Sequence, residues 1–306
     1  MRVLVSGLIN IETNVTVENF PIQYNPIEYA FNGVSCSISG VAYNVINALN
    51  ALGDKIEPVS IIGKDTFGNL IKEDLQERCS SSKNIFQELD STCTSVIMFD
   101  SRGRRKIYCD LKDIQDRIIP LGSIEKDIPL CDGLVICNIN FNDELIKNAK
   151  RFNKPVFTDV HILKDIHDSY NERFLKNADV VFLSDEELSC QPEEFIESIH
   201  NAYKNKVIVL GQGEKGALLF DGETRKFHFV KSVYTRPVVN TVGAGDALFS
   251  SFVHYYLKGI PPYECLEKAV VFASYKIGES GGARGFVTEE QLEGIIKSRN
   301  DASKAV

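Results

Sequence analysis

Short runs of apolar, often β-branched residues alternate along much of the chain with segments in which apolar residues recur at helical spacing. The runs that read as strands are 1–7, 57–63, 133–139, 154–160, 178–184 and 206–212. The segments that read as helices include 41–53, 70–79, 142–152 and 193–205. Strands that are apolar almost throughout, with helices between them, are typical of a parallel sheet covered on both faces. The pattern predicts an α/β fold with a doubly wound, mostly parallel sheet.

Two segments interrupt this alternation. Residues 13–37 contain two extended, aromatic-rich runs, and residues 92–110 read as a hairpin with its turn at Asp100-Ser101-Arg102-Gly103. Both look like antiparallel excursions from the main sheet. We therefore expect a small β lid made of 13–37 and 92–110. The α/β core is expected to comprise 1–12, 38–91 and 111–306.

Composition and charge narrow the class of protein. The 306 residues carry a formal net charge of −8, with 43% hydrophobic and 25% charged residues, which indicates a soluble globular protein. An acidic chain is not expected to bind nucleic acid or an anionic membrane. The first apolar run is too short for a signal peptide, and no run is long enough to span a membrane. The eight cysteines form no Cys-x-x-Cys pair, so reduced thiols in the cytoplasm are expected.

The stretch VVNTVGAGDALFSSFVHYYLKG, residues 238–259, carries the candidate chemistry. Helical spacing runs from Ala247 to Leu257, so the preceding GAGD is expected in a loop that leads into a helix N-terminus. Small residues there let an anion approach backbone N–H groups that have no partner within the helix. The Asp246 carboxylate could then accept the proton of an attacking hydroxyl. The alternative is that Asp246 only caps the helix and the glycines only form a turn.

The segment NTVGAGDALFSSF resembles the C-terminal signature of the PfkB family, the ribokinase-like sugar and nucleoside kinases. Four other segments resemble motifs of the same family, in the same order and with similar spacing. They are GLINIE ending at Glu12, SGVAYNVINALNALG over 39–53, IIGKDTFG over 61–68, and SDEEL ending at Leu188. The agreement covers most of the chain, which a chance match to GAGD alone would not give.

This resemblance implies a ribokinase-like fold and ATP-dependent phosphorylation of a hydroxyl of a small sugar. Asp246 would be the catalytic base, and Gly243, Ala244 and Gly245 would form the anion cradle. The implied substrate contacts are Asn10, Glu12, Gly40 and Asn44. The implied ATP neighbours are Ser184, Gly213, Gly216 and Val242. Glu187 would act on Mg²⁺ through water. A nucleoside kinase, such as a pseudouridine kinase, and a non-catalytic sugar- or nucleotide-binding protein are the alternatives.

Several positions depart from the family pattern. Asn240 replaces the usual Asp beside the expected monovalent-cation loop, which leaves dependence on K⁺ open. Ser184 stands where the family has Asn, and Ser39 replaces the first Gly of a Gly-Gly pair. Glu12 is one methylene longer than the usual Asp. Together these differences leave the identity of the substrate open.

Three further features have competing interpretations. GQGEKG, residues 211–216, fits G-x-G-x-x-G, but the strand-like ALLFDG follows it, so a hairpin is expected rather than a dinucleotide-binding turn. His161 at a strand end is interpreted as structural or solvated. Arg104-Arg105-Lys106 is interpreted as a solvated strand edge.

Aromatic residues within 13–37 need a partner, because so few strands cannot bury them alone. Tyr24, Tyr29 and Phe31 are expected either to line the substrate side of the lid or to form a lid-to-lid face. We therefore expect a homodimer through the lid.

Overall fold

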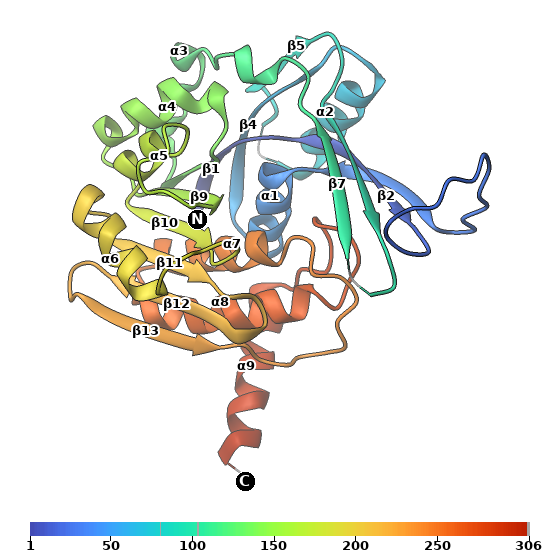
Figure 1. Ribbon diagram of the computed structural model, residues 1–306. Helices are drawn as coiled ribbons and strands as arrows, with labels where there is room; N and C mark the ends of the chain where they lie inside the picture. The colour runs from blue at the N-terminus through green and yellow to red at the C-terminus, as the bar shows by residue number, and fades with distance from the viewer. Residues whose placement is uncertain (80, 103, 305–306) are drawn as a thin grey trace.

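The computed structural model describes residues 1–79, 81–102 and 104–304. Its main sheet has nine strands in the order β13-β12-β11-β10-β9-β8-β1-β4-β5 (Figure 1). The strands are β1 Arg2–Ser6, β4 Lys55–Gly63, β5 Ile85–Leu89, β8 Gly133–Ile136, β9 Val156–Ile162, β10 Val180–Ser184, β11 Val207–Gly211, β12 Gly216–Asp221 and β13 Lys226–Lys231. Neighbours from β11 to β5 are parallel, whereas β11–β12 and β12–β13 are antiparallel. The doubly wound, mostly parallel sheet is confirmed.

Helices cover both faces of this sheet. They are α1 Val41–Ala51, α2 Thr66–Arg78, α3 Leu121–Ile124, α4 Asp143–Asn148, α5 Glu172–Asn177, α6 Pro192–Tyr203, α7 Ala244–Leu257, α8 Pro262–Lys276 and α9 Glu289–Lys304. Because successive strand residues point to opposite faces, Val3 and Val5 of β1 pack in one core cluster with α1, α7 and α8. Leu4 packs in a second cluster with α4, α5 and α6.

One predicted helix, 142–152, is divided in the structure. The α-helix α4 ends at Asn148, and the 3-10 helix η4 Ala149–Phe152 continues it. Asn153 then adopts a left-handed backbone with φ 51°, which ends the turn. The other 3-10 turns are η1 Ile114–Asp116, η2 Ile128–Leu130, η3 Asn140–Asn142 and η5 Gly213–Lys215.

A separate sheet of four strands, in the order β3-β2-β6-β7, corresponds to the expected lid. Its strands are β2 Asn10–Thr16, β3 Val34–Ser39, β6 Thr94–Phe99 and β7 Arg105–Asp110. β6 and β7 pair antiparallel as the predicted hairpin. Of its predicted turn, Gly103 lies outside the described residues.

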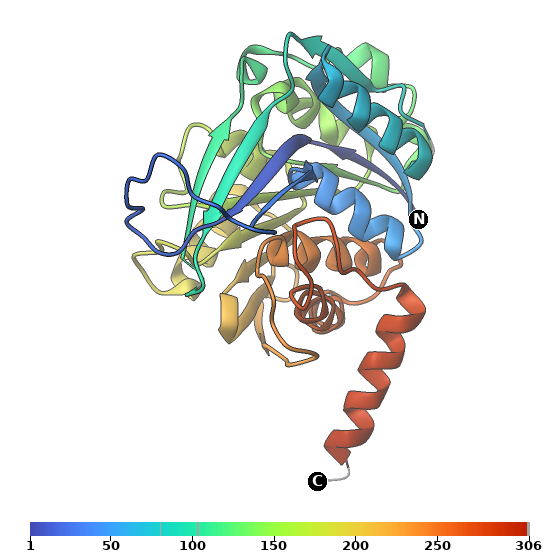
Figure 2. The ribbon, with the colours of Figure 1, turned by 90° about the vertical axis from the view of Figure 1, so that its right-hand side faces the viewer.

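Two details of this lid sheet differ from the expectation. The sheet begins at Asn10 rather than at residue 13, so Asn10 and Glu12 lie on β2 and not on the first core strand. Residues 17–33 form an irregular loop instead of extending the strands, and Figures 1 and 2 both show this loop projecting beyond the rest of the molecule. The aromatic side chains of Tyr24, Tyr29 and Phe31 in this loop are exposed to solvent and do not pack in the core.

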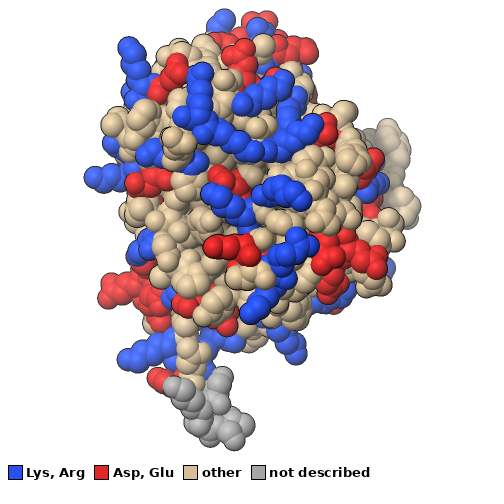
Figure 3. Space-filling model, turned by 90° about the vertical axis from the view of Figure 1, so that its left-hand side faces the viewer, with Lys and Arg blue, Asp and Glu red and all other residues tan. Residues whose placement is uncertain are grey.

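The surface carries charges of both signs. Figure 3 shows Lys and Arg side chains together with Asp and Glu over the face at the left of Figure 1, where α4, α5 and α6 lie. Helical ion pairs such as Lys147–Asp143 and Lys176–Glu172 contribute to this pattern. Within the part of the chain that the structure describes, no helix is both long enough and apolar enough to cross a membrane.

Candidate active site

The GAGD segment forms the first turn of α7 rather than the loop that was expected. Gly243 is the N-cap residue, with φ 76°, and the helix begins at Ala244. A Cβ atom on Gly243 would lie 2.6 Å from the carbonyl oxygen of Gly282, so both the backbone angle and the close approach favour glycine. Asp246 is therefore the third residue of the helix.

Among the described residues, no hydrogen bond joins the Asp246 carboxylate to the backbone of the first turn of α7. Its Oδ2 instead accepts a hydrogen bond of 2.7 Å from Nδ2 of Asn44, a residue of α1. Because this hydrogen bond joins the carboxylate to another helix and not to its own, the capping interpretation loses its support. The carboxylate is held where two elements of the core meet.

The surroundings of Asp246 suit proton transfer. Burial raises the pKa of its carboxyl group to about 6, while the Asn44 hydrogen bond and the nearby charges of His161 and Lys276 lower it and Asp159 raises it. A base with a pKa just below neutral is ionised at pH 7 and still able to accept a proton.

Residues from the lid sheet lie close to this base. The pairing of β2 with β3 places Asn10 opposite Ser39, and Gly40 follows as the N-cap of α1 with φ 104°. A Cβ atom on Gly40 would lie 2.5 Å from the carbonyl oxygen of Leu8, which excludes larger residues. Asn44 stands one turn farther along α1. The structure thus brings all four predicted substrate contacts to one junction.

The polar atoms at this junction are only partly satisfied. Glu12 is buried, and its two oxygens accept hydrogen bonds from Nδ2 of Asn14 at 2.8 Å and from Oγ of Ser39 at 3.0 Å. Nδ2 of Asn10 donates to Oγ of Ser95 at 3.1 Å. The Oδ1 atoms of Asn10 and Asn44 are buried and have no hydrogen-bond partner among the residues that the structure describes. Two unpaired carbonyl oxygens are suited to accept hydrogen bonds from the hydroxyl groups of a bound polyol.

A cavity of about 210 Å³ lies between the lid sheet and the carboxyl ends of the main strands. It is lined by Leu8, Val41, Cys109, Leu111, Gln115, Cys137, Asn138, Ile139, His161 and Tyr170. The charge of His161 acts on Asp246, and that of Asp246 acts on Cys137, so the cavity adjoins the candidate base. Its volume is below the ~300–1,000 Å³ typical of pockets for drug-sized ligands, so the enclosed part suits a small ligand.

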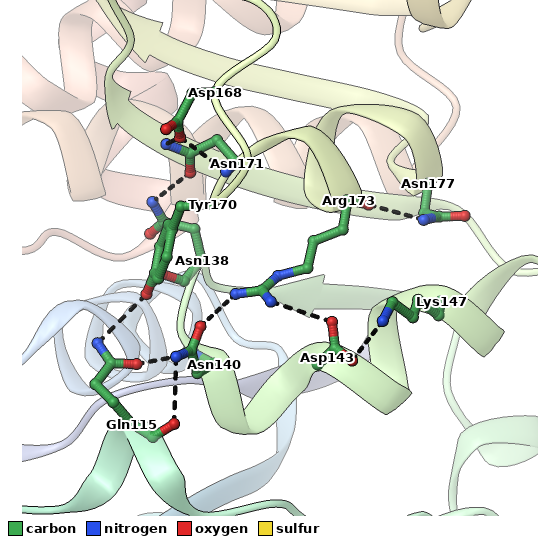
Figure 4. Close-up of polar contacts among 10 residues, drawn as sticks. All are labelled: Gln115, Asn138, Asn140, Asp143, Lys147, Asp168, Tyr170, Asn171, Arg173 and Asn177. Carbon is green, nitrogen blue, oxygen red and sulfur yellow. Dashed lines mark hydrogen bonds and ion pairs between the residues drawn. The ribbon is translucent and has the colours of Figure 1, made fainter.

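The amide groups of the cavity wall bond to one another. Figure 4 shows Gln115 and Tyr170 pointing toward each other, and the Tyr170 hydroxyl donates to the backbone oxygen of Asn138 at 3.0 Å. Nδ2 of Asn138 donates to Oδ1 of Asn171 at 3.1 Å, and Nδ2 of Asn140 donates to the Gln115 backbone oxygen at 3.2 Å. Such a network holds the wall in place and leaves a largely apolar surface toward the cavity.

His161 lies near the end of β9, as expected, and its backbone is unusual. It lines the cavity, has φ 58°, and its backbone N–H donates to Oδ1 of Asp159 at 2.8 Å. A left-handed backbone at a residue other than glycine is uncommon and clusters at functional sites. The His161 side chain is 42% exposed, so its interpretation as a structural or solvated residue stays a prediction, although it lies in the wall beside Asp246.

Of the predicted ATP neighbours, Ser184, Gly213 and Gly216 lie at or just after the carboxyl ends of β10 and β11, whereas Val242 directly precedes the N-cap of α7. Ser184 pairs with Gly211, and η5 joins the antiparallel strands β11 and β12, which confirms the hairpin at GQGEKG. A Cβ atom on Gly216 would lie 2.1 Å from the carbonyl oxygen of Val230, whereas Gly213 has open space around it. The open side of Gly213 leaves room for a ligand.

Glu187 lies in the turn that follows β10. Its exposed carboxylate forms an ion pair of 2.8 Å with Lys164, and its backbone has φ 65°. Within the described part of the chain no hydrogen bond or ion pair joins Glu187 to Asp246. Its predicted role toward Mg²⁺ thus stays a prediction.

The sequence matches the profile of the pfkB family carbohydrate kinases over residues 1–289. The chain belongs to this family. It is a carbohydrate kinase, a phosphotransferase with an alcohol group as acceptor, and the fold and activity class expected from its motifs are confirmed.

Relatives of this PfkB-family kinase agree along nearly their whole length. An acarbose 7(IV)-phosphotransferase of Actinoplanes sp. is 23% identical over 274 residues, which cover 89% of this chain and 91% of that protein. An ATP-dependent ribose-1-phosphate kinase of Halopiger xanaduensis is 23% identical over 303 residues, or 98% of this chain and 100% of that protein. The solved structure of a microbiome-derived acarbose kinase has a TM-score of 0.86 at 20% identity, covering 97% of this chain and 98% of that one.

Two charged residues beside Asp246 had been missed. Asp159, in the middle of β9, and Lys276, the last residue of α8, both act on its pKa in this PfkB-family kinase. Lys276 stands in the run AVVFASYKIG, where a single lysine follows a mostly apolar helix. A charge in that position is the signal that could have identified it.

Proposed function

We propose that the chain transfers the γ-phosphoryl group of ATP to a hydroxyl of a small sugar, with Asp246 as the general base. The observation that carries this proposal is the position of Asp246. Its carboxylate is held by Asn44, has a pKa near 6, and adjoins both a small cavity and two unpaired buried carbonyl oxygens. Asp246 would accept the hydroxyl proton as the oxygen attacks phosphorus.

The first turn of α7 would stabilise the charge on the transferring phosphoryl group. The N–H of Ala244 already donates to the carbonyl oxygen of Thr241 at 3.1 Å, and the N–H of Ala247 donates to that of Gly243 at 3.0 Å. Among the described residues, the N–H groups of Gly245 and Asp246 have no such acceptor. The same holds for the N–H of Gly243, so the N–H groups of Gly243, Gly245 and Asp246, without that of Ala244, would form the anion cradle at the positive end of the helix.

ATP would extend from this turn toward Ser184, Gly213, Gly216 and Val242. Mg²⁺ requires few protein ligands because it keeps several waters and binds the phosphates. A single exposed carboxylate such as Glu187 fits a contact through water, although Lys164 shares that carboxylate. When bound, Mg²⁺ would neutralise charge on the phosphates. The side chains of the protein would supply orientation and the base.

The acceptor is proposed to be a sugar. Both relatives named above act, by their names, on carbohydrates, and the junction offers Asn10, Glu12 and Asn44 to hydroxyl groups. A nucleoside is the second candidate, because the largely apolar wall beside Tyr170 could receive a base. Because the Asp246 carboxylate is ionised at neutral pH and can still accept a proton, a catalytic role is favoured over a purely binding one.

We propose that the lid pairs with the lid of a second copy, giving a homodimer. Ile27, Tyr29 and Phe31 on the projecting loop are 72%, 77% and 87% exposed. Every residue of β7 is exposed as well. Apolar side chains exposed together in this way are typical of a surface that another chain covers.

A ligand screen tests the proposed function. Thermal shifts would be measured for a panel of sugars and nucleosides, each with and without a non-hydrolysable ATP analogue. We expect a sugar to raise the melting temperature more in the presence of the analogue, and to be phosphorylated when ATP replaces it. Stabilisation by nucleosides alone would favour the second candidate. If none of the sugars that stabilise the protein causes release of ADP when ATP is present, the assignment of Asp246 as the base of a kinase is contradicted.

A further inference from the structure

Lys276 is a buried charge without a carboxylate partner. It is the last residue of α8, its exposed fraction is 0%, and no described carboxylate forms an ion pair with it. Its Nζ donates to the backbone oxygens of Val242 and, at 2.7 Å, of Gly281. Burying an ammonium group among neutral acceptors is costly, and burial lowers the pKa of Lys276 to about 8. A position with this cost calls for a functional reason.

The two carbonyl groups belong to the two loops that frame the candidate base. Val242 precedes the N-cap of α7, and Gly281 precedes Gly282, whose backbone packs against Gly243. A Cβ atom on Gly282 would lie 2.7 Å from Nδ2 of Asn44, the amide that holds Asp246. Lys276 therefore links the loop that leads into Asp246 to the loop that lies against Asn44.

Backbone bonds at the end of α8 reinforce this link. The N–H groups of Val239 and Asn240 donate to the carbonyl oxygen of Ile277 at 2.8 and 3.1 Å. Oδ1 of Asn240 in turn accepts from the N–H of Val242 at 2.7 Å. The Val242 carbonyl oxygen accepts from Lys276, and among the described residues no backbone N–H of α7 donates to it. The N–H of Asp246 is left available to a ligand.

A bound monovalent cation does not fit this arrangement. The sequence signature implied a cation loop beside Asn240, and backbone oxygens such as those of Val242 and Gly281 are the ligands that K⁺ prefers. The Nζ of Lys276 already lies in hydrogen-bond contact with both oxygens. A cation bound to these two oxygens would have to displace the lysine ammonium group or would be repelled by its positive charge.

We propose that the Lys276 ammonium group replaces a bound monovalent cation, so that the kinase positions its anion cradle without K⁺. Lys276 is thus a positioning residue, which acts through the Val242 and Gly281 loops and does not touch the substrate. The inference rests on the proposed role of Asp246 and α7 in phosphoryl transfer.

The first experiment compares chloride salts of K⁺, Na⁺ and tetramethylammonium at constant ionic strength. Wild-type turnover is expected to be the same in all three. In Lys276→Ala, we expect kcat to fall roughly 10- to 100-fold, as for other residues that orient a site without contacting the substrate. K⁺ or NH₄⁺, which can enter the vacated space, should restore much of the lost rate. Strong activation of the wild type by K⁺ would overturn the proposal.

Two matched variants complete the test. Lys276→Met fills the space with an apolar chain of similar length, so its rate should fall and no cation should restore it. Lys268→Ala removes another lysine of α8, one that pairs with Glu293 at 2.6 Å, and should show no cation dependence. Restoration of Lys276→Met by K⁺ to the same degree as Lys276→Ala would contradict the idea of a vacated site.

Melting temperatures without substrate provide a readout that does not depend on activity. Lys276→Ala should be stabilised by K⁺ relative to tetramethylammonium, and the wild type should not. This outcome would hold even if no sugar were phosphorylated, so failure of the proposed function can be distinguished from failure of this inference. If Lys276→Ala does not fold in any salt, the wild-type series and Lys276→Met provide the test instead. Stabilisation of the wild type by K⁺ would then reject the proposal that Lys276 replaces a bound cation.

Discussion

The main sheet and the lid sheet differ in what holds them in place. Four of the five residues of β1 are buried, all but the first, and four of the five residues of β10 are buried, all but the last. In the lid sheet, by contrast, β7 is exposed along its whole length and β3 over its first three residues. A thin sheet that covers no core of its own depends on neighbours for its position. The main sheet is therefore fixed by its own buried core, whereas the position of the lid sheet depends more on its neighbours.

The candidate site joins these two parts of the molecule. Asn44 and Asp246 come from helices packed on the main sheet, while Asn10 and Glu12 come from β2 of the lid sheet. Changes on the core side are therefore expected to lower kcat, and changes on the lid side to raise KM for the sugar. The predictions below test this division, beginning with the largest effect.

Replacement of the base should have the largest effect. Asp246→Asn keeps an oxygen that can accept the Asn44 hydrogen bond but cannot take a proton at neutral pH. We expect kcat to fall roughly 10²- to 10⁴-fold, with binding of ATP and sugar close to that of the wild type. Steady-state kinetics and isothermal titration measure both quantities. A variant that melts early but turns over normally when folded would show that Asp246 is only structural.

Loss of the lid carboxylate should act on substrate binding. A hydrogen bond to a charged group contributes about 1.5–3 kcal/mol, so Glu12→Ala should raise the KM for the sugar roughly 10- to 100-fold and leave that for ATP nearly unchanged. Ser39→Ala, which removes only one of the donors to Glu12, is the control and should have a smaller effect. Equal changes in both KM values would assign Glu12 a purely structural role.

The raised pKa of Asp246 predicts two pH effects. The value of kcat/KM should fall about tenfold per pH unit below about 6, as the base becomes protonated. Folding stability has the opposite trend. The folded protein binds this proton more tightly than the unfolded chain, in which the carboxyl pKa has its ordinary value of 3.8. The free energy of unfolding should therefore fall as the pH rises from about 3.8 to about 6, where the loss is complete.

Asp246→Asn removes that destabilisation and serves as the comparison for the pH effect. Its melting temperature should exceed that of the wild type at pH 8, and the difference should vanish toward pH 4. A constant difference across this range would mean that the carboxyl group does not titrate near 6.

A comparison of Gly243 with Gly259, which have nearly the same φ, separates the cost of a left-handed backbone from the cost of close packing. Gly243 has φ 76° and Gly259 has φ 78°, but only Gly243 has a backbone neighbour, Gly282, in the way of a Cβ atom. Gly259→Ala should cost about 1–2 kcal/mol for the left-handed backbone. Gly243→Ala should cost more, and should also reduce turnover because the cradle shifts. Chemical denaturation and kinetics of the two variants provide the measurement, and equal losses would argue against close packing at Gly243.

The smallest effect on chemistry is expected at the projecting loop. The double change Tyr29→Ser and Phe31→Ser should weaken the proposed dimer, with at most a few-fold change in kcat, because the loop lies far from the buried core. Sedimentation velocity of wild type and variant over a dilution series tests this. A wild type that remains monomeric at every concentration would reject the dimer.

Much of the fold could be predicted because its signals are local. The runs at 133–139 and 178–184 are apolar on both faces, and only a sheet covered on both sides buries them. The lid boundaries were less accurate, since β2 begins at Asn10 by pairing with β3 and β6, and such pairing is not encoded in either strand alone. The irregular loop 17–33 was read as strands because its aromatic composition favours them.

The sequence by itself determined the class of the protein: the order of five motifs, the alternation of strands and helices, and the acid that follows a glycine turn. The tertiary structure alone decided how these residues act. Asn44 and Asp246 are 202 positions apart and yet share a hydrogen bond. His161 became a cavity residue, and Lys276 became an internal cation, because chain folding placed them beside the base. Local patterns reflect burial and backbone preference, whereas electrostatics and hydrogen bonding depend on distances that only the packed chain defines.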